Sequence, residues 1–575
     1  MNNNSKSNNS LNAPLFIDPV NALLVMETEN LLSDPIEVTS PLRRPLQNSS
    51  QNDTIPVYWD SRDLPAANEK SKTGLPQFIF VARSGAKFDG HSLIEDILAQ
   101  GNIFVGESSR ISDFLIKLNR PADWISEVLE HPHLIKVTST SQALYRLLEV
   151  ASQLHCNQFV SIGVTGTNGK TSVTQISSQM IENITQKQSL RIGTLGIQIG
   201  PETIEGSYPT MPDYPGFIRS VLWAKKNNVQ NIVLEATSHG LSEDRLGSWK
   251  LDVGIFTNLT QDHLDYHGTM QKYRAAKSLL FDQCIKSTGT AVINTDDPEW
   301  EFFAHKALQA QISLIGFGTA NNKDNFFALT ARKNISSRFL LVKQKSTLSD
   351  GLLGTWSFEN EKGALVEVQY QCPLIGNFQH ENLAASACAM LALGFPLNQI
   401  AQTTSTIKGI PGRLEAVVIE NKNQSLLPLV LVDYAHSPDA LEKAILTLNS
   451  VKKPGSRVYC VFGCGGDRDA SKRPIMGKIA SENADYCIIT SDNPRTELPE
   501  KIIEDILKGI TNRQKVIAEV DRRTAITQAI LNAEPHDIVL IAGKGHENYQ
   551  ILGQKKYPFS DVQEAMAALE QKIAK

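Results

Sequence analysis

Short apolar, β-branched runs alternate with amphipathic segments over most of this chain from about residue 57 onward. Residues 76–85 (PQFIFVARSG) predict a β-strand, and residues 92–101 (SLIEDILAQG) predict an amphipathic helix that ends at Gly101. The FVGE run that follows predicts a second strand. This region is therefore expected to form a small α/β unit.

The alternation lengthens from about residue 153 and starts again after the GIPGRLEAV segment at 409–417. The apolar runs 231–237 and 252–259 predict strands of a parallel sheet that helices cover. Beyond residue 417 there are four short apolar runs, LPLVLVDYA, SRVYCVFG, DYCIIT and DIVLIAG. Each precedes a Gly, Asp or Asn and then a helix-like segment, which predicts a second α/β domain of the dinucleotide-binding type.

These patterns divide the chain, whose 575 residues are too many for one hydrophobic core, into an extension and three domains. Residues 1–50 are rich in Asn, Ser, Pro and Leu and predict a disordered or loosely ordered extension. The predicted fold class is α/β, with a small N-terminal α/β domain at 51–152, a central parallel-sheet domain with a phosphate-binding loop at 153–408, and a C-terminal Rossmann-like domain at 409–575.

Composition narrows the range of functions. A net charge of −5 supplies no basic footprint for nucleic acid. No apolar run approaches the ~18 residues that span a bilayer, and the first residues, MNNNSKSNNS, contain no hydrophobic segment of a signal peptide. The seven cysteines are scattered, which favours free thiols in a reducing compartment. We expect a cytoplasmic protein that binds neither nucleic acid nor membranes.

The stretch GVTGTNGKTS at 163–172 follows an apolar run and precedes a helix-like segment. Strand, glycine-rich turn and helix are the context of a phosphate-binding loop, in which backbone N–H groups face the phosphates. Lys170 can reach the terminal phosphates, and the Thr171 hydroxyl can bind Mg²⁺. The common spacing would place the first glycine at position 164, whereas here it is Gly163, and Gly166 is additional.

A second group of polar side chains follows the next strands of the central domain. Glu235 ends the run NIVLEAT, where a carboxylate can bind Mg²⁺ beside a nucleotide or can instead cap a turn. Residues 257–277, TNLTQDHLDYHGTMQKYRAAK, contain two aspartates and two histidines, including His263, directly after a strand. Such a density of titratable groups indicates a site better than a set of helix caps. Lys277 lies in an apolar helix, where a lysine either extends to solvent or is modified.

Four polar motifs follow the four strands of the C-terminal domain: DYAH (433–436), GCGGDRDASKRP (463–474), DNPR (492–495) and GKGHE (543–547). Open α/β sheets bind ligands at this end of their strands. Asn493 precedes Pro494 and is held extended, which presents Asp492 and Arg495 together. One acid and one guanidinium side by side suit an amino acid that carries both an amine and a carboxylate, and Arg468 offers a fork for carboxylate or phosphate. Any one motif can be a turn, but four at the ends of one sheet indicate a site.

The motifs occur in an order that resembles a known family. They are GTNGKT, EATSHGL, TNLTQDHLDYHG with YRAAK, IGNFQHENLAAS, GRLEAV, VDYAHSPDALEKAI, VFGCGGDRDASKRP, DNPRTE and AGKGHENYQ. Together they resemble the Mur ligases, from about residue 57 to the end of the chain. The N-terminal WDSR and DGH elements agree with this resemblance.

The resemblance implies an N-terminal domain that holds a UDP group, a central ATPase domain and a C-terminal domain that binds an amino acid. It is most specific for the branch that adds the third residue of the peptidoglycan stem peptide. There, ATP phosphorylates the D-Glu carboxylate of UDP-MurNAc-L-Ala-D-Glu, and the amine of the amino acid attacks the acyl phosphate. Members with DNPR add meso-diaminopimelate, whose second carboxylate Arg495 can bind through two hydrogen bonds. Mg²⁺ as cofactor and a monomeric, cytoplasmic enzyme are also implied.

The resemblance assigns roles to matching positions. Residues implied to bind ATP are Gly166, Thr167, Asn168, Gly169, Lys170, Thr171, Ser172, Asn377 and Asp433. Residues implied in catalysis are Lys170, Glu235, His263, Lys277 and Arg413, and those implied to bind Mg²⁺ are Thr171, Glu235, His263 and a carbamylated Lys277. Residues implied to bind UDP-MurNAc-dipeptide are Trp59, Ser61, Ala86, Lys87, Phe88, Thr210, Met211, Thr237, Glu243 and Arg245. Residues implied to bind diaminopimelate are Arg468, Asp492, Asn493, Pro494, Arg495, Gly543 and Glu547.

Four positions depart from the family pattern. Met211 replaces a second threonine and lacks its hydroxyl, and Glu243 replaces a glutamine and cannot donate a hydrogen bond when ionised. Thr237 replaces a serine and Ser172 a threonine, and both keep a hydroxyl.

Three alternatives remain open on the sequence. A lysine-adding ligase would leave Arg495 without its carboxylate partner. A ligase like folylpolyglutamate synthase shares the ATP loop but does not account for DNPR or GCGGDRD. A non-catalytic nucleotide-binding scaffold would be expected to have lost one of Lys170, Glu235, His263 and Lys277, and all four are present.

Overall fold

The computed structural model describes most of the chain. The described residues are 15–17, 55–60, 64, 77–84, 88–204, 209–331, 335–348, 351–359, 365–419 and 426–574. The chain groups into two compact units, unit 1 (Met1–Gly163, Lys187–Asp252, His263–Lys286) and unit 2 (Val164–Gln186, Val253–Asp262, Ser287–Lys575). Of the predicted features, most of the 1–50 extension and the positions Ser61, Ala86 and Lys87 lie outside the described residues.

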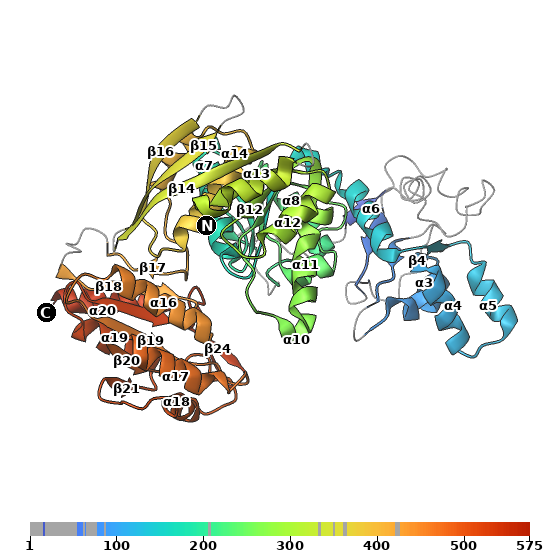
Figure 1. The fold of residues 1–575 in the computed structure, drawn as a ribbon. Helices are drawn as coiled ribbons and strands as arrows, with labels where there is room; N and C mark the ends of the chain where they lie inside the picture. The colour runs from blue at the N-terminus through green and yellow to red at the C-terminus, as the bar shows by residue number, and fades with distance from the viewer. Residues whose placement is uncertain are drawn as a thin grey trace, which may run out of the picture. The chain divides into compact units, whose positions relative to one another are not determined.

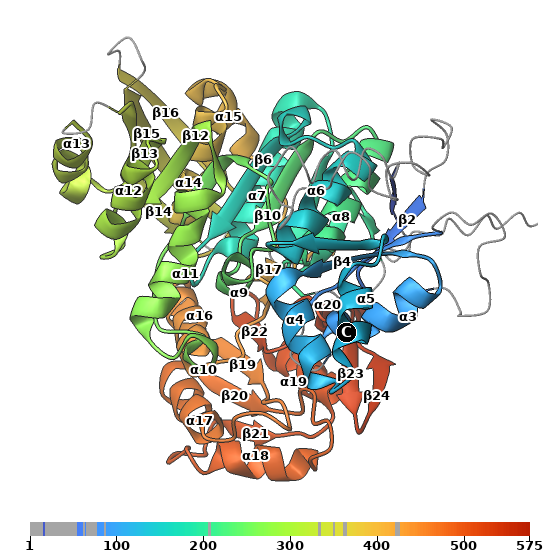
Figure 2. The same ribbon diagram turned by 90° about the vertical axis from the view of Figure 1, so that its right-hand side faces the viewer.

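The N-terminal part of unit 1 contains a five-stranded sheet. Its strands, in hydrogen-bonded order, are β1 (Leu15–Ile17), β2 (Ile55–Tyr58), β3 (Ile79–Val81), β4 (Ile103–Glu107) and β5 (Leu134–Val137). Its helices are η2 (Gly90–Leu93), α3 (Ile94–Ala99), α4 (Ser108–Lys117), α5 (Ala122–Leu129) and α6 (Thr140–Ser152). The predicted strands and helix are confirmed by β3, β4 and α3, of which β4 and α3 are labelled in Figure 2. Strand β1, antiparallel to β2, falls within the predicted extension and was not expected.

The rest of unit 1 contains the sheet run β11-β6-β10-β7-β8-β9. The strands are β6 (Val160–Thr165), β7 (Ser189–Gly193), β8 (Gly196–Ile199), β9 (Glu202–Thr203), β10 (Asn231–Glu235) and β11 (Leu251–Phe256). The helical segments are η3 (Cys156–Gln158), α8 (Tyr214–Lys226), α9 (Ser238–Ser242), α10 (Leu264–His267) and α11 (Met270–Gln283). β6 and β11 continue into unit 2, since the division of the chain falls within both strands.

The central part of unit 2 contains the run β16-β15-β14-β13-β12-β11-β6. The further strands are β12 (Ile285–Asn294), β13 (Ser313–Gly318), β14 (Ser337–Leu348), β15 (Gly351–Glu359) and β16 (Leu365–Cys372). The helical segments are α7 (Lys170–Thr185), α12 (Trp300–Gln309), η4 (Ala320–Asn322), α13 (Lys323–Ala331), α14 (Gln379–Ala392) and α15 (Leu397–Thr404). The predicted parallel pairing is present from β12 to β14, whereas β14, β15 and β16 form an antiparallel edge that the sequence did not predict.

The C-terminal domain is a separate six-stranded sheet of unit 2. Its order is β17 (Glu415–Ala416), β18 (Leu429–Asp433), β22 (Ile538–Ala542), β19 (Val458–Phe462), β20 (Tyr486–Ile489) and β21 (Val516–Ala518). Beside it are α16 (Pro438–Val451), α17 (Lys472–Asn483), α18 (Pro499–Leu507), α19 (Arg522–Asn532), α20 (Asp561–Ala574) and the hairpin β23 (Tyr549–Leu552) and β24 (Lys555–Pro558). The four predicted strands are confirmed as the parallel strands β18, β22, β19 and β20.

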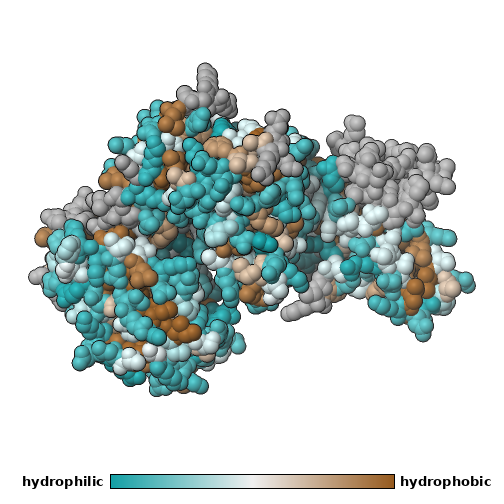
Figure 3. All heavy atoms as spheres, viewed as in Figure 1, coloured by the Kyte–Doolittle hydropathy of each residue, from teal (hydrophilic) through white to brown (hydrophobic). Residues whose placement is uncertain are grey.

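Helices lie on both faces of the C-terminal sheet (Figure 1), and each face is packed by a hydrophobic core. Side chains at alternate strand positions point to opposite faces, so Cys460 packs with α16, α17 and α18, and Val461 packs with α19 and α20. Both faces are buried, which explains the continuous apolar runs of the sequence. Hydrophilic residues predominate on the surface seen in Figure 3. None of the described helices is long and apolar enough to cross a membrane.

Candidate functional site

The glycine-rich loop lies between β6 and α7, as predicted. Gly166 and Gly169 have φ angles of +148° and +85°, and a Cβ at position 166 would overlap Thr257 Oγ1. A Cβ at position 169 would lie 2.6 Å from Asn382 Oδ1 on α14. The extra glycine at 166 is therefore required by the backbone, because a side chain fits neither its conformation nor its surroundings.

Residues after β11 hold the other side of this loop. Thr167 donates its N–H to Asn258 O (2.9 Å) and its hydroxyl to Thr260 O (3.0 Å). Asn168 donates its N–H to Asn258 Oδ1 (2.9 Å), and Thr257 Oγ1 donates to Asn168 O (2.7 Å). The TNLT sequence therefore shapes the loop. The sequence alone does not show this function, because Asn258 lies 90 residues from Asn168.

The loop lysine lies against the loop itself. Lys170 Nζ donates to Gly166 O (3.0 Å) and Thr167 O (2.8 Å). Thr171 and Ser172 are buried in the first turn of α7, with side-chain Thr171 Oγ1 3.5 Å from Arg413 Nη2. An ammonium, a guanidinium and the N-terminus of a 16-residue helix thus occupy one place in unit 2. Together they supply the positive potential that polyphosphate binding requires.

Arg413 is positioned by residues of the C-terminal domain. Its guanidinium carbon lies 5.2 Å from the centre of the Tyr434 ring. Asp433, at the end of β18, accepts the N–H groups of Leu414 (2.8 Å) and Ala435 (2.9 Å). Burial raises the pKa of the Asp433 carboxyl, and the Arg413 charge opposes that rise. Asn377, the remaining residue of this predicted group, is exposed just before α14.

The predicted metal ligands Glu235, His263 and Lys277 belong to unit 1. Glu235 is buried at the end of β10, where it accepts the N–H (2.8 Å) and the hydroxyl (3.1 Å) of Thr194. A Cβ at Gly193 would overlap its carboxylate, so only glycine fits beside it. These contacts, from a turn 41 residues earlier, orient the carboxylate and were not predictable from the sequence.

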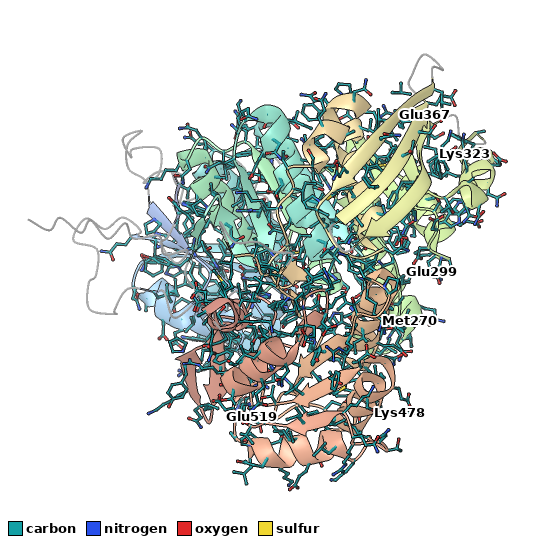
Figure 4. The ribbon with its side chains drawn as sticks, turned by 90° about the vertical axis from the view of Figure 1, so that its left-hand side faces the viewer. Met270, Glu299, Lys323, Glu367, Lys478 and Glu519 are labelled. Atoms are coloured by element: carbon teal, nitrogen blue, oxygen red, sulfur yellow. The ribbon has the colours of Figure 1, made fainter. Side chains whose placement is uncertain are left out.

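Lys277 lies on α11, the helix that begins at Met270 (Figure 4). A cluster of three histidines, from α9 and from the start and end of α10, lies beside it. The Lys277 side chain is buried, and its ammonium lies 4.4 Å from the centre of the Tyr273 ring. The rings of His263 and His267 lie 5.0 and 5.4 Å from that of His239. Burial and the charges of His239, His263 and Lys277 lower the pKa of His267. Among the described residues, no three His, Cys, Asp or Glu side chains are grouped as a preformed metal site.

The positions predicted to bind the muramoyl dipeptide meet around α9. Thr237 caps this helix through its hydroxyl (3.0 Å from Gly240 N). Met211 is buried, and a Cβ at Gly240 would overlap its sulfur, so the methionine side chain fills a packing position. Arg245 donates to Met211 O and forms two hydrogen bonds, of 2.9 and 2.7 Å, with Glu243 Oε2. Glu243, which departs from the family pattern, is thus an internal partner of Arg245.

Three other predicted positions have simpler surroundings. Trp59 lies under the Arg219 guanidinium, whose carbon is 4.5 Å from the ring centre. Phe88 is exposed, and Thr210 is half-buried.

The DNPR and GKGHE motifs come together at the carboxyl ends of β20 and β22. Asn493 Nδ2 donates to Glu547 Oε2 (2.9 Å), and Asn493 Oδ1 accepts the N–H of Ile551 (2.9 Å). Asp492 is buried, and a Cβ at Gly543 would lie 2.6 Å from its Oδ2. Pro494 is also buried. The predicted grouping of these residues is therefore present in the fold.

Arg495 and Arg468 lie on the loops around this group. Arg495 has a φ of +52° and donates from Nη1 to Gly466 O (2.7 Å). The two loops are joined further by Gly466 N, which donates to Asn493 O (2.9 Å). Arg468 is exposed, with Nη1 3.5 Å from Asp467 O. Arg495 is therefore held beside Asn493, whereas Arg468 extends outward.

Lys544 completes the group and was not singled out in the sequence. Its side chain is fully buried, and Nζ donates to Asn493 Oδ1 (3.2 Å) and Glu547 Oε2 (3.1 Å). Burial raises the pKa of the Asp492 carboxyl, and the charges of Arg522 and Lys544 oppose that rise. A lysine buried between an amide and a carboxylate is an orienting group, and the only sequence signal for it was its place within GKGHE.

Comparisons with known proteins find relatives over most of the chain. A family model described as the Mur ligase middle domain matches residues 164–390, and one described as the Mur ligase, glutamate ligase domain, matches residues 412–545. A Rickettsia rickettsii protein named UDP-N-acetylmuramoyl-L-alanyl-D-glutamate–2,6-diaminopimelate ligase is 35% identical over 508 residues, covering 88% of this chain and 96% of that protein. A Trichormus variabilis protein of the same name is 37% identical over 494 residues, covering 86% and 92%.

A solved structure of a ligase with that name has a TM-score of 0.63 and 28% identity, covering 94% of this chain and 98% of its own. The fold, the phosphate loop and these matches define an ATP-dependent ligase. The chain belongs to the Mur ligase family.

Proposed function

We propose that this enzyme adds meso-2,6-diaminopimelate to UDP-MurNAc-L-Ala-D-Glu, with cleavage of ATP to ADP and phosphate, in the cytoplasmic synthesis of peptidoglycan precursors. The observation that carries the proposal is the group formed by Asp492, Asn493, Arg495 and Glu547 at two strand ends. Its carboxylates suit an ammonium, and its guanidinium suits a carboxylate at a distance from that ammonium. The names of the relatives support the same substrate.

The phosphate loop is proposed to bind ATP. Lys170 would exchange its two carbonyl partners for phosphate oxygens, and Arg413 would add a second positive charge. A carboxylate resists attack by an amine, and its phosphorylation supplies a leaving group. Fixed positive charges stabilise the negative charge that develops on the transferred phosphoryl group and on the tetrahedral intermediate.

Mg²⁺ is proposed as the cofactor, with Thr171 and Glu235 as protein ligands of one ion, and with His263 and a carbamylated Lys277 as protein ligands of a second. Thr171, Glu235 and the carbamate of Lys277 would supply the oxygen ligands that Mg²⁺ prefers, and His263 would supply a nitrogen. Mg²⁺ takes only a few ligands from the protein when phosphates supply others. Carbamylation would change the buried Lys277 from a cation to an oxygen donor and would place a negative charge among the three histidines. When bound, Mg²⁺ would neutralise charge on the phosphates. We propose a monomer that acts on small molecules only.

The test is ATP-dependent phosphate release by the purified protein with UDP-MurNAc-L-Ala-D-Glu and with meso-diaminopimelate, L-lysine or no amino acid. We expect release only with meso-diaminopimelate. Release with L-lysine would retain the ligase and contradict the specificity assigned to Arg495. Absence of release with either amino acid, in a protein that binds ATP, would contradict the ligase proposal and favour a nucleotide-binding scaffold.

Lys544→Met is expected to raise KM for meso-diaminopimelate about tenfold. The substitution removes the ammonium that donates to both Asn493 and Glu547 and so orients them. KM for ATP is expected to stay within about twofold of wild type. The matched control is Lys478→Met, on α17, whose side chain is 65% exposed and points outward (Figure 4). Equal KM values for Lys544→Met and the control would show that Lys544 does not orient the site.

A further inference from the structure

A fully buried ion pair joins the first residues of α19 and α20. Arg522 Nη2 lies 2.7 Å from Asp561 Oδ2, Arg522 Nε lies 2.8 Å from Asp561 Oδ1, and both side chains are 0% exposed. This is the two-pronged geometry that a guanidinium makes with a carboxylate. The two residues are 39 positions apart, and none of the motifs of the sequence contains them.

The same guanidinium also binds two main-chain carbonyls. Arg522 Nη2 donates to Ala542 O (3.0 Å), and Nη1 donates to Ser491 O (3.5 Å). These carbonyls belong to the residues directly before Gly543 and Asp492. Strands β22 and β20 are not neighbours, since β19 lies between them in the sheet. Arg522 therefore connects two strand ends that the sheet itself does not join.

The spacing of these strand ends affects the proposed amino-acid site. A Cβ at Gly543 would lie 2.6 Å from Asp492 Oδ2, so the Asp492 carboxylate packs against the Gly543 backbone at a distance that only glycine allows. At the end of the intervening β19, a Cβ at Gly463 would overlap Thr490 O. A small displacement of either strand end would therefore move the buried Asp492 carboxylate. The Arg522 charge also opposes the rise that burial causes in the pKa of Asp492.

Stability alone does not explain this pair. Removal of two charges from water costs more than their attraction commonly returns, and well-packed apolar side chains often replace such a pair without loss of stability. Apolar side chains, however, cannot donate to Ser491 O and Ala542 O. What only Arg522 provides is therefore the pair of hydrogen bonds that holds these two carbonyls in position.

We propose that Arg522, held by Asp561, is a positioning residue that sets the distance between Asp492 and Gly543 and thereby the affinity for the incoming amino acid. This inference rests on the proposed function, in which Asp492 contacts that substrate. The inference predicts that loss of the pair changes KM for the amino acid and not KM for ATP or UDP-MurNAc-L-Ala-D-Glu. A general loss of structure would affect all three substrates.

The test compares wild type with the double variant Arg522→Met/Asp561→Leu. We expect KM for meso-diaminopimelate to increase about tenfold. The kcat and the KM values for ATP and UDP-MurNAc-L-Ala-D-Glu are expected to stay within about twofold of wild type, and Tm is expected to stay near that of wild type. The matched control is Arg523→Met/Glu564→Leu, which removes the neighbouring ion pair (2.9 Å) between the same two helices, in which Arg523 is 65% exposed. The control is expected to keep all three KM values.

Arg522→Lys provides a second measurement if the double variant does not fold. It keeps the charge but not the planar fork, and its KM for meso-diaminopimelate is expected to rise severalfold. An unchanged KM for meso-diaminopimelate in a folded variant, or an equal rise for all three substrates, would overturn the inference alone. A wild-type enzyme whose phosphate release does not depend on meso-diaminopimelate would overturn the proposed function, and the inference with it.

Discussion

Replacement of Lys170 by methionine is expected to lower kcat about 10³-fold, the largest effect predicted for this chain. The Lys170 ammonium lies within the phosphate loop, where it donates to Gly166 O and Thr167 O. Methionine keeps the length and most of the apolar volume of the side chain but removes the charge that stabilises the transferred phosphoryl group. The measurement is steady-state phosphate release, together with the affinity for ATP.

The matched control for Lys170→Met is Lys226→Met, at the exposed end of α8. It is expected to leave kcat within about twofold, because surface charges contribute little. A fall in kcat of less than tenfold for Lys170→Met, with an unchanged Tm, would contradict the role assigned to this lysine.

Replacement of Arg495 by alanine is expected to lower kcat/KM for meso-diaminopimelate about 100-fold, which corresponds to about 2–3 kcal/mol for a charge-assisted pair of hydrogen bonds. The value for L-lysine is expected to change much less, because lysine has no second carboxylate. Arginine and alanine both carry a Cβ, so the strain of the +52° φ angle at this position is present in both proteins. Competition between the two amino acids in one assay measures the loss of discrimination directly.

Arg495→Ala also removes the hydrogen bond from Nη1 to Gly466 O, so its Tm must be measured beside its activity. Arg513→Ala is the matched control, since Arg513 is exposed in the same domain. Arg495→Lys separates charge from geometry, because it keeps the positive charge without the fork. Equal losses of kcat/KM for meso-diaminopimelate and L-lysine would show that Arg495 does not recognise the second carboxylate.

Sequence and structure agree best where the signal is local. The strand before the loop, Gly166, Gly169 and the start of α7 at Lys170 are all encoded within residues 160–170, and the structure confirms their arrangement. The four apolar runs of the C-terminal domain likewise predict its parallel strands, because a strand covered on both faces is apolar at every position.

Agreement ends where residues far apart in the chain contact one another. The antiparallel edge strands β15 and β16 escaped prediction, because periodicity does not report the direction in which a strand pairs. Met211 was interpreted through the hydroxyl that it lacks, whereas the structure buries its side chain against Gly240. The same limit applies to Glu243, whose position in the chain does not show that it pairs with Arg245.

The sequence by itself therefore determined the α/β class, the phosphate loop and the motifs at four strand ends, because each depends on residues within a few positions of one another. Only the tertiary structure decided which groups orient these motifs: Thr194 for Glu235, Lys544 for Asn493 and Glu547, and the Arg522–Asp561 pair for Asp492 and Gly543. The physical reason is that a buried polar group must find its hydrogen-bond partner in space. Which residue supplies that partner depends on how strands and helices pack, and the spacing of residues along the sequence does not show this packing.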